Sequence, residues 1–147
     1  MNVLMMLIGS HQHTTITLSG ATVEGTTSAE HGIIIRTDGT IDQQANGTTT
    51  QLSPTTDWII PNSAAATDYE FRVTGVTWDI DPPFSTSPGV DEAWYDLTGG
   101  DLSWFVQDLS STAAGANNVS FTLEVRKGSS GTALASATYN INVDWEV

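Results

Sequence analysis

Strict alternation of apolar and polar residues is the feature that most constrains this 147-residue chain, and it is clearest at the C-terminus. In VSFTLEVR, residues 119–126, every second side chain is apolar, and ATYNINVDWEV, residues 137–147, repeats the pattern. Side chains of a β-strand point alternately to opposite faces, so this period predicts strands with one buried and one solvated face. Residues 128–132, rich in Gly and Ser, predict a loop between them. We therefore expect a long antiparallel hairpin at the C-terminus.

A second strong signal is the Asp-Gly dipeptide at positions 38 and 39, between two isoleucine-bearing runs in GIIIRTDGTIDQQ, residues 32–44. Asp-Gly between apolar runs is typical of a β-hairpin turn. A two-residue turn would put Arg36 opposite Ile41, whereas a three-residue turn at 37–39 pairs Ile35 with Ile41. The second register keeps charge off the apolar face and places Gly39 where a positive φ is needed. We therefore expect the three-residue turn, with a bulge.

A change of parity marks the middle of the chain. In residues 69–73 the apolar side chains fall at odd positions, and after Gly75 they fall at even positions. A single glycine at such a point predicts a bulge or bend. Gly99 and Gly100, between the strand-like segments 93–97 and 102–109, predict a further hairpin corner.

The remaining segments are shorter or irregular. Residues 14–20 and 56–61 each predict a short strand, and residues 113–116, interrupted by a glycine, predict loop rather than helix. Residues 79–92 hold three of the five prolines and predict an extended surface excursion. Eight or nine strands with turn signals about every 10 residues indicate an antiparallel sandwich or barrel.

The balance of charge excludes some classes of partner. The chain carries 17 Asp and Glu residues against 4 Lys and Arg residues, a formal net charge of −13. A nucleic-acid partner requires a basic patch that neutralises phosphates, and residues 73–125 contain no Lys or Arg. Anionic membrane surfaces are disfavoured for the same reason. The chain also has no cysteine, which excludes disulfides and thiolate metal sites.

The N-terminal residues 1–13 contain an unbroken apolar run of six residues, 3–8, and we expect them to form an arm outside the folded domain. Six residues are too few to span a bilayer, and the run lacks the basic flank and cleavage site of a signal peptide. An exposed apolar run promotes aggregation unless something covers it. We expect the arm to add an edge strand to its own sheet or to lie against a neighbouring subunit.

No cluster of residues predicts catalysis. His11 and His13 share a strand face, but an octahedral metal site would need three copies of the chain around an axis. A pair of glycosidase carboxylates would need a cleft, and no nucleophile elbow, phosphate-binding loop or dinucleotide motif is present. We predict no catalytic residues, no cofactor and no metal site. Four carboxylates that could instead bind calcium are Asp79, Asp81, Asp91 and Glu92.

Tryptophan is unusually frequent. Most of these residues lie in alternating segments, so we expect core packing with the indole N–H bonded to backbone. The alternatives are a protein interface or a sugar-stacking platform that includes Tyr95. Trp94 and Trp104 flank one predicted hairpin corner, and we expect them to be neighbours across strands or sheets. The five tryptophans are Trp58, Trp78, Trp94, Trp104 and Trp145.

Four motifs in a fixed order resemble those of a known family. They are RTDGTID, then DWIIP with TDYEFRVTG, then AWYDLTGGDLSWFV, and then the whole segment 119–147. Together they resemble small immunoglobulin-like or fibronectin-like β-sandwich proteins of tailed-bacteriophage virions, and the likeness covers residues 14–147. The resemblance implies an all-β, antiparallel immunoglobulin-like β-sandwich of about 8–9 strands at residues 14–147, and the arm expected at 1–13 lies outside the likeness.

The resemblance also implies a structural, non-enzymatic role in the head, neck or tail of a virion assembled in the bacterial cytoplasm. Its partners would be other virion proteins and copies of the chain itself, and the family pattern supplies no catalytic residues. The alternatives are a carbohydrate-binding host-attachment module, which requires Trp78, Trp94 or Trp104 on an exposed flat face, and a small hydrolase. The arm and the proline-rich loop depart from the family pattern, and the contacts that we expect there are Val3, Leu4, Met5, Met6, Leu7, Ile8, Pro82, Pro83 and Phe84.

Overall fold

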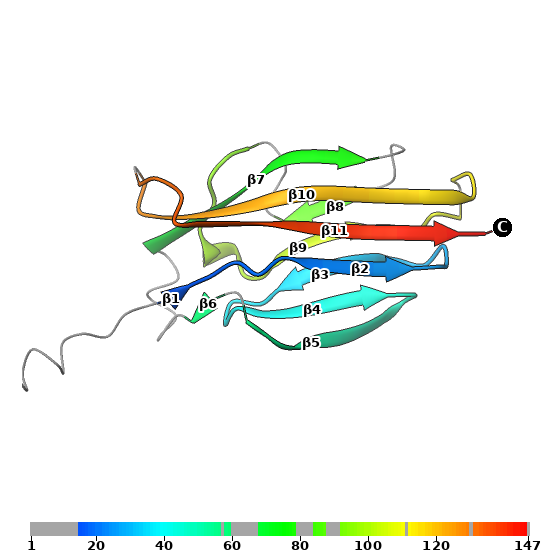
Figure 1. Ribbon diagram of the computed structural model, residues 1–147, viewed down its shortest axis with the longest axis horizontal. Coiled ribbons are helices and arrows are strands. Elements are labelled where there is room, and N and C mark those ends of the chain that lie inside the picture. The colour runs from blue at the N-terminus through cyan, green and yellow to red at the C-terminus, as the bar shows by residue number, and fades with distance from the viewer. Residues whose placement is uncertain are drawn as a thin grey trace, which may run out of the picture.

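The computed structural model describes residues 15–56, 58–59, 68–78, 84–87, 92–110, 112–129 and 131–146. Strands make up nearly all of the regular structure in these ranges, and they form two large sheets and a small two-stranded one (Figure 1). The large sheets hold four and five strands. Their total of nine in the described ranges confirms the prediction of an all-β, mainly antiparallel sandwich with about 8–9 strands.

The four-stranded sheet is built around the C-terminal hairpin. Its order is β2 (Ala21–Gly25), β11 (Ala135–Trp145), β10 (Gly115–Lys127) and β7 (Tyr69–Trp78). The strands β10 and β11 pair antiparallel along the whole length of β11, as their alternation predicts. The pair β2–β11 is parallel, so this sheet is mixed at one edge.

The five-stranded sheet has the order β5 (Thr48–Thr56), β4 (Thr40–Ala45), β3 (His31–Ile35), β9 (Leu102–Val106) and β8 (Phe84–Ser87), all antiparallel. The short strands β1 (Thr15–Ile16) and β6 (Trp58–Ile59) pair with each other, which confirms the two short strands predicted there. Figure 1 shows β5 as the outermost strand of its sheet, next to β4.

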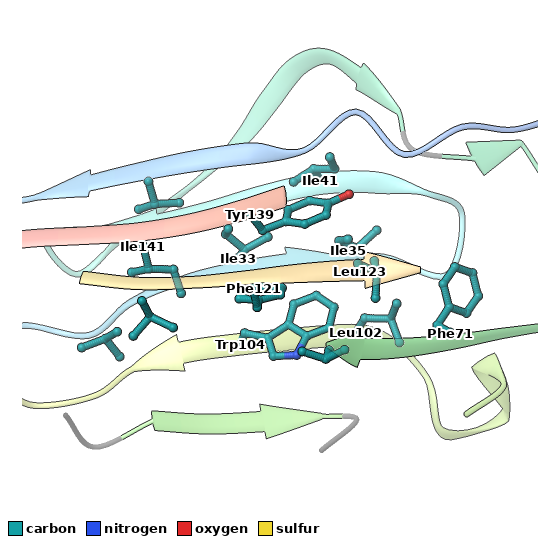
Figure 2. Close-up of a cluster of buried hydrophobic side chains, with 14 of the residues drawn as sticks. Ile33, Ile35, Ile41, Phe71, Leu102, Trp104, Phe121, Leu123, Tyr139 and Ile141 are labelled. Carbon is teal, nitrogen blue, oxygen red and sulfur yellow. The ribbon is translucent and has the colours of Figure 1, made fainter. Parts of the chain in front are cut away.

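Alternate side chains of both sheets fill the space between them (Figure 2). Trp104 of β9 lies against Phe121 of β10 with ring centroids 4.8 Å apart, and Phe121 stacks on Tyr139 of β11 at 5.6 Å. Burying one such side chain completely contributes about 1.5–3 kcal/mol. The hairpin alone contributes eight buried apolar side chains: Val119, Phe121, Leu123, Val125, Tyr139, Ile141, Val143 and Trp145.

Two local predictions are confirmed in detail. Ile35 pairs with Ile41, the Gly39 N–H donates to the Arg36 carbonyl over 2.7 Å, and Gly39 has a φ of 89°. This is the three-residue turn, and it keeps both isoleucines in the core. Gly75 has a φ of 59°, and the register of β7 against β10 shifts at this position. The extra residue of the bulge reverses the inward face of β7, as the change of parity predicts.

Three other local predictions are wrong. Gly99 and Gly100 do not join a hairpin, because Tyr95 pairs its backbone with Phe71 of β7 whereas β9 pairs with β3 in the other sheet. The 3₁₀ turn at Leu97–Gly99 therefore carries the chain from one sheet to the other. Residues 115 and 116 belong to β10 rather than to a loop, and β8 occupies part of the segment 79–92 that was expected to be irregular.

Candidate interaction surface

The residues predicted as contacts fall mostly outside the described part of the chain. Residues 1–14, with the apolar run and both N-terminal histidines, lie outside it, and so do Pro82 and Pro83. Phe84 begins β8, but its side chain is not described. The contacts expected at 3–8 and at 82–84 stay predictions.

The acidic residues considered for calcium also lie largely outside the described ranges. Asp79, Asp81 and Asp91 are beyond them, whereas Glu92 is exposed and has a φ of 61°. Where the structure describes the chain, no three His, Cys, Asp or Glu side chains gather to hold a metal ion. Across the same ranges no helix has the length and apolar character needed to cross a bilayer.

Two tryptophans confirm the core prediction. Trp104 is fully buried and Trp145 is 8% exposed. The indole N–H groups of both have no hydrogen-bond acceptor among the described residues, so the predicted bonds to backbone are wrong. The reason is geometric: backbone carbonyls of a sheet point along the sheet towards neighbouring strands, not into the space between the sheets.

Trp94 lies on the outer face of the four-stranded sheet and is not a neighbour of Trp104. Its ring centroid is 4.6 Å from the guanidinium carbon of Arg72 and 4.2 Å from that of Arg126. Both arginines alternate with buried residues of β7 and β10 and so point outward. The prediction that the two tryptophans are neighbours is wrong because their segments belong to different sheets.

Ion pairs hold the two guanidinium groups against the Trp94 ring. Arg72 Nε lies 2.6 Å from Glu124 Oε2, and Arg126 Nη2 lies 2.6 Å from Glu70 Oε2. Stacking of a cation on an indole contributes about 0.5–2 kcal/mol, more where water is excluded. The carbohydrate-binding alternative stays a prediction. The Trp58 and Trp78 side chains lie outside the described residues.

The edge strand β5 presents an uncharged surface. Residues 48–51 are all exposed, and Leu52 packs partly against the core. No Lys, Arg, Asp or Glu occurs anywhere in residues 43–56. Native proteins usually protect an edge strand with charged side chains, proline or a bulge. Pro54 and a register shift protect the second half of β5, whereas the register is regular from Thr48 to Gln51.

A two-residue turn determines which backbone groups of β5 face outward. Asn46 and Gly47 have φ values of 51° and 76°, the signature of a type I′ turn, and they connect Ala45 with its partner Thr48. The pair that closes such a turn is hydrogen-bonded, and bonded and non-bonded pairs then alternate. Thr48 and Thr50 therefore direct their backbone groups to β4. Thr49 and Gln51 direct theirs to the free edge.

A buried histidine fixes the position of this turn. His31 is fully buried at the start of β3, and its Nε2 accepts a hydrogen bond from the Asn46 N–H over 2.9 Å. The Asn46 side-chain Oδ1 accepts from the Thr26 N–H over 2.8 Å. A Cβ atom on Gly25 of β2 would lie 2.0 Å from His31 Nε2, so the imidazole fills the space above a glycine. These contacts attach the β4–β5 turn to both sheets.

The charged groups nearest to this edge make local bonds and keep a net negative charge. Arg36 bonds to Asp42 of β4 through Nε and Nη2 and to Asp101 through Nη1, over 2.6–2.9 Å. These bonds, first that of Asp42 and then that of Asp101, raise the pKa of the Arg36 guanidinium above its usual value. The Gln44 side chain donates to Glu30 over 3.0 Å on the outer face. The edge itself therefore remains uncharged between these pairs.

No protein-family model, curated protein or solved structure matches the chain. The β5 edge is therefore interpreted from its own backbone groups and charge. The sequence analysis did not single out the residues that build it, although Asn46 and Gly47 form one of the strongest short hairpin signals. No sequence signal marks His31 as the residue behind that turn.

Proposed function

We propose that this chain is a structural, non-enzymatic subunit of a tailed-phage virion, held in the particle by copies of itself and by other virion proteins. The observation that carries the proposal is where the family-like motifs fall in the fold. RTDGTID forms the β3–β4 turn, YEFRVTG forms most of β7, and the last motif forms β10 and β11. Because these motifs form strands and turns of the β-sandwich, they support a structural role, by analogy with the family.

The surface chemistry supports the same proposal. A net charge of −13 limits nonspecific association and disfavours contact with packaged DNA. It also suits docking on a basic lattice of other virion proteins. The free β5 edge supplies main-chain donors and acceptors for a neighbouring strand, which is a common mode of attachment between subunits.

The experiment that tests the proposal follows the chain into particles. A tagged full-length chain, produced during infection of the host bacterium, is expected to purify with particles through a density gradient. A chain without residues 1–8 is expected to keep its circular dichroism spectrum but to stay out of the particles, because the apolar arm is the predicted attachment. The matched control is His11→Gln with His13→Gln, which leaves the apolar run intact and should be incorporated normally.

Two outcomes would contradict the proposal at different levels. Normal incorporation of the chain lacking residues 1–8 would refute the arm as the attachment. Absence of the full-length chain from purified particles would refute the virion role itself.

A further inference from the structure

The turn between β4 and β5 contains the only Asn-Gly dipeptide of the chain, at positions 46 and 47. Asparagine followed by glycine is the dipeptide most prone to deamidation, because glycine has no side chain to hinder attack by its own backbone nitrogen on the asparagine amide. Asn46 and Gly47 are both exposed, so water reaches them. The turn therefore combines a reactive sequence with access to water.

The folded turn keeps the two reacting groups apart. Asn46 and Gly47 have φ values of 51° and 76°, as in a type I′ turn. In such a turn the peptide nitrogen that follows the first central residue points away from that residue's side chain. The attack therefore requires the turn to open.

Two hydrogen bonds hold Asn46 in the closed turn. The Thr26 N–H donates to Asn46 Oδ1 over 2.8 Å. His31 Nε2 bonds to Asn46 in either tautomer, because it accepts from the Asn46 N–H over 2.9 Å or donates to Asn46 Oδ1 over 3.0 Å. His31 is fully buried, so its ring is a fixed partner for an exposed turn.

We propose that Asn46 is a modification site controlled by this turn: the side-chain amide survives while the turn is closed, and each opening allows the Gly47 nitrogen to attack it. A bond forms between the Gly47 nitrogen and Asn46 Cγ, the bond between Cγ and Nδ2 breaks, and the Gly47 proton leaves with Nδ2 as ammonia. Water then hydrolyses the five-membered imide at one of its two carbonyls. The products are aspartate and isoaspartate, each with a new carboxylate.

Isoaspartate makes the modification an irreversible change of the fold. Its main chain runs through Cβ and so contains one more carbon than that of asparagine. A two-residue turn with this extra atom no longer brings Ala45 opposite Thr48, the pair with which the β4–β5 register begins. The modification therefore alters the uncharged strand β5 and adds a negative charge beside it.

Peptide mapping by mass spectrometry, on the purified full-length chain incubated at mildly alkaline pH, tests the site. Deamidation of Asn46 should be at least about tenfold faster in urea, where the turn is absent, because each of the two hydrogen bonds lowers the open fraction about fivefold. Asn140 and Asn142 are internal controls. Their side chains donate to Thr22 and Glu24 and β-branched residues follow them, so they should stay unmodified.

A pair of variants tests the part played by His31. His31→Leu removes the bond to Asn46 and should speed deamidation of the folded chain about fivefold. His31→Gln keeps a donor and an acceptor at a similar reach and should remain close to the rate of the unaltered chain. In urea all three chains should react equally, since His31 acts only through the folded turn. Circular dichroism checks that each variant is folded.

The product supplies a separate measurement. Ion-exchange chromatography separates the deamidated chain by its added charge, and amide hydrogen exchange then reports on the β4–β5 pairing. The amides of Thr48 and Thr50, which bond to β4, should exchange rapidly in the isoaspartate form. Asn46→Asp adds the same charge without lengthening the main chain, so it should keep both amides protected.

Three results would overturn the inference. No deamidation of Asn46 in folded chain or in urea would refute the site. Equal rates in the folded chain and in urea would refute control by the turn, and this comparison needs no variant. Protected amides at Thr48 and Thr50 in the isoaspartate form would refute the change of fold. None of these results depends on the particle experiment, so the modification and the virion role can fail separately.

Discussion

The contact between Gly25 and His31 allows the sharpest test of the core, because a single pair of residues, one from each sheet, makes it. A methyl group on Gly25 would lie 2.0 Å from His31 Nε2 and 2.1 Å from Cδ2, both far below contact distance. His31 is fully buried and its ring is bonded to the Asn46 N–H, so it cannot move aside without losing that bond. Gly25 itself has no positive φ, so alanine is conformationally allowed there.

The expected cost of Gly25→Ala follows from these contacts. Overpacking of a core costs about 1–3 kcal/mol, and loss of the histidine hydrogen bond adds about 1 kcal/mol. Replacing glycine at an allowed conformation restores about 0.4–1 kcal/mol through the unfolded chain. We therefore expect the free energy of unfolding to fall by about 1–3.5 kcal/mol, measured by urea denaturation followed by tryptophan fluorescence. Gly99→Ala is the matched control, because a Cβ there meets no atom within 4 Å, and it should change stability little.

The effect of Gly25→Ala on the free energy of unfolding should change from destabilising to stabilising when the imidazole is absent. His31→Ala alone removes a buried ring and should be destabilising, but it opens space above Gly25. Adding Gly25→Ala to that chain should then stabilise it by up to about 1 kcal/mol, through the unfolded chain and the buried methyl group. The double-mutant cycle should thus give a coupling of about 3 kcal/mol. An equal cost of Gly25→Ala in both backgrounds would refute the steric reasoning.

Three further predictions concern the turn and the charged contacts. Asn46→Ala should destabilise the chain by about 1–2 kcal/mol more than Asn46→Gly in urea denaturation, because both lose the side-chain acceptor but only alanine resists a φ of 51°. Arg126→Met should lower stability by about 1 kcal/mol and expose Trp94 to acrylamide quenching, whereas Lys127→Met, which removes one positive charge and a longer contact of 5.9 Å with the Tyr69 ring, should leave the quenching of Trp94 unchanged. Bonds from the Thr40 N–H and then the Thr40 hydroxyl lower the pKa of Asp38 below its ordinary 3.8. The stabilisation from Asp38 is therefore complete above pH 3.8 and is lost as pH falls below it, so Asp38→Asn should flatten that part of the stability–pH profile.

The parts of the fold that the sequence predicts correctly are those where the two faces of a strand differ in polarity. The C-terminal hairpin is one such case, because each residue of β10 and β11 is either core or solvent and a shift by one residue would exchange the faces. The turn at Asp38 and Gly39 is another, because only one register keeps Arg36 off the isoleucine face. In both cases the local sequence and the burial of apolar side chains favour the same strand register.

The parts that it does not predict lack such a difference between faces. The segment FSTS of β8 and the residues TTTQ of β5 lie on sheet edges, and they show no apolar alternation. Gly99 and Gly100 mark a change of direction correctly, but a glycine pair does not distinguish a hairpin from a crossing between sheets. The sequence does not predict the β5 edge because its residues are polar and uncharged and show no apolar alternation.

Polar atoms buried in the core gather at the same end of the sandwich as the β4–β5 turn. His31 packs over Gly25, which pairs with Val143, and Val143 pairs with the buried Asn117 on its other side. His31 Nδ1 and Asn117 Oδ1 have no hydrogen-bond partner in the part of the chain that the structure describes. Each such atom costs about 1–3 kcal/mol, which offsets part of the stabilisation that burial gives at this end. The hydrogen bond between His31 and Asn46 compensates in part, since it holds the turn from which β5 runs. The position of β5 therefore depends on a contact made beside incompletely bonded polar groups of the core.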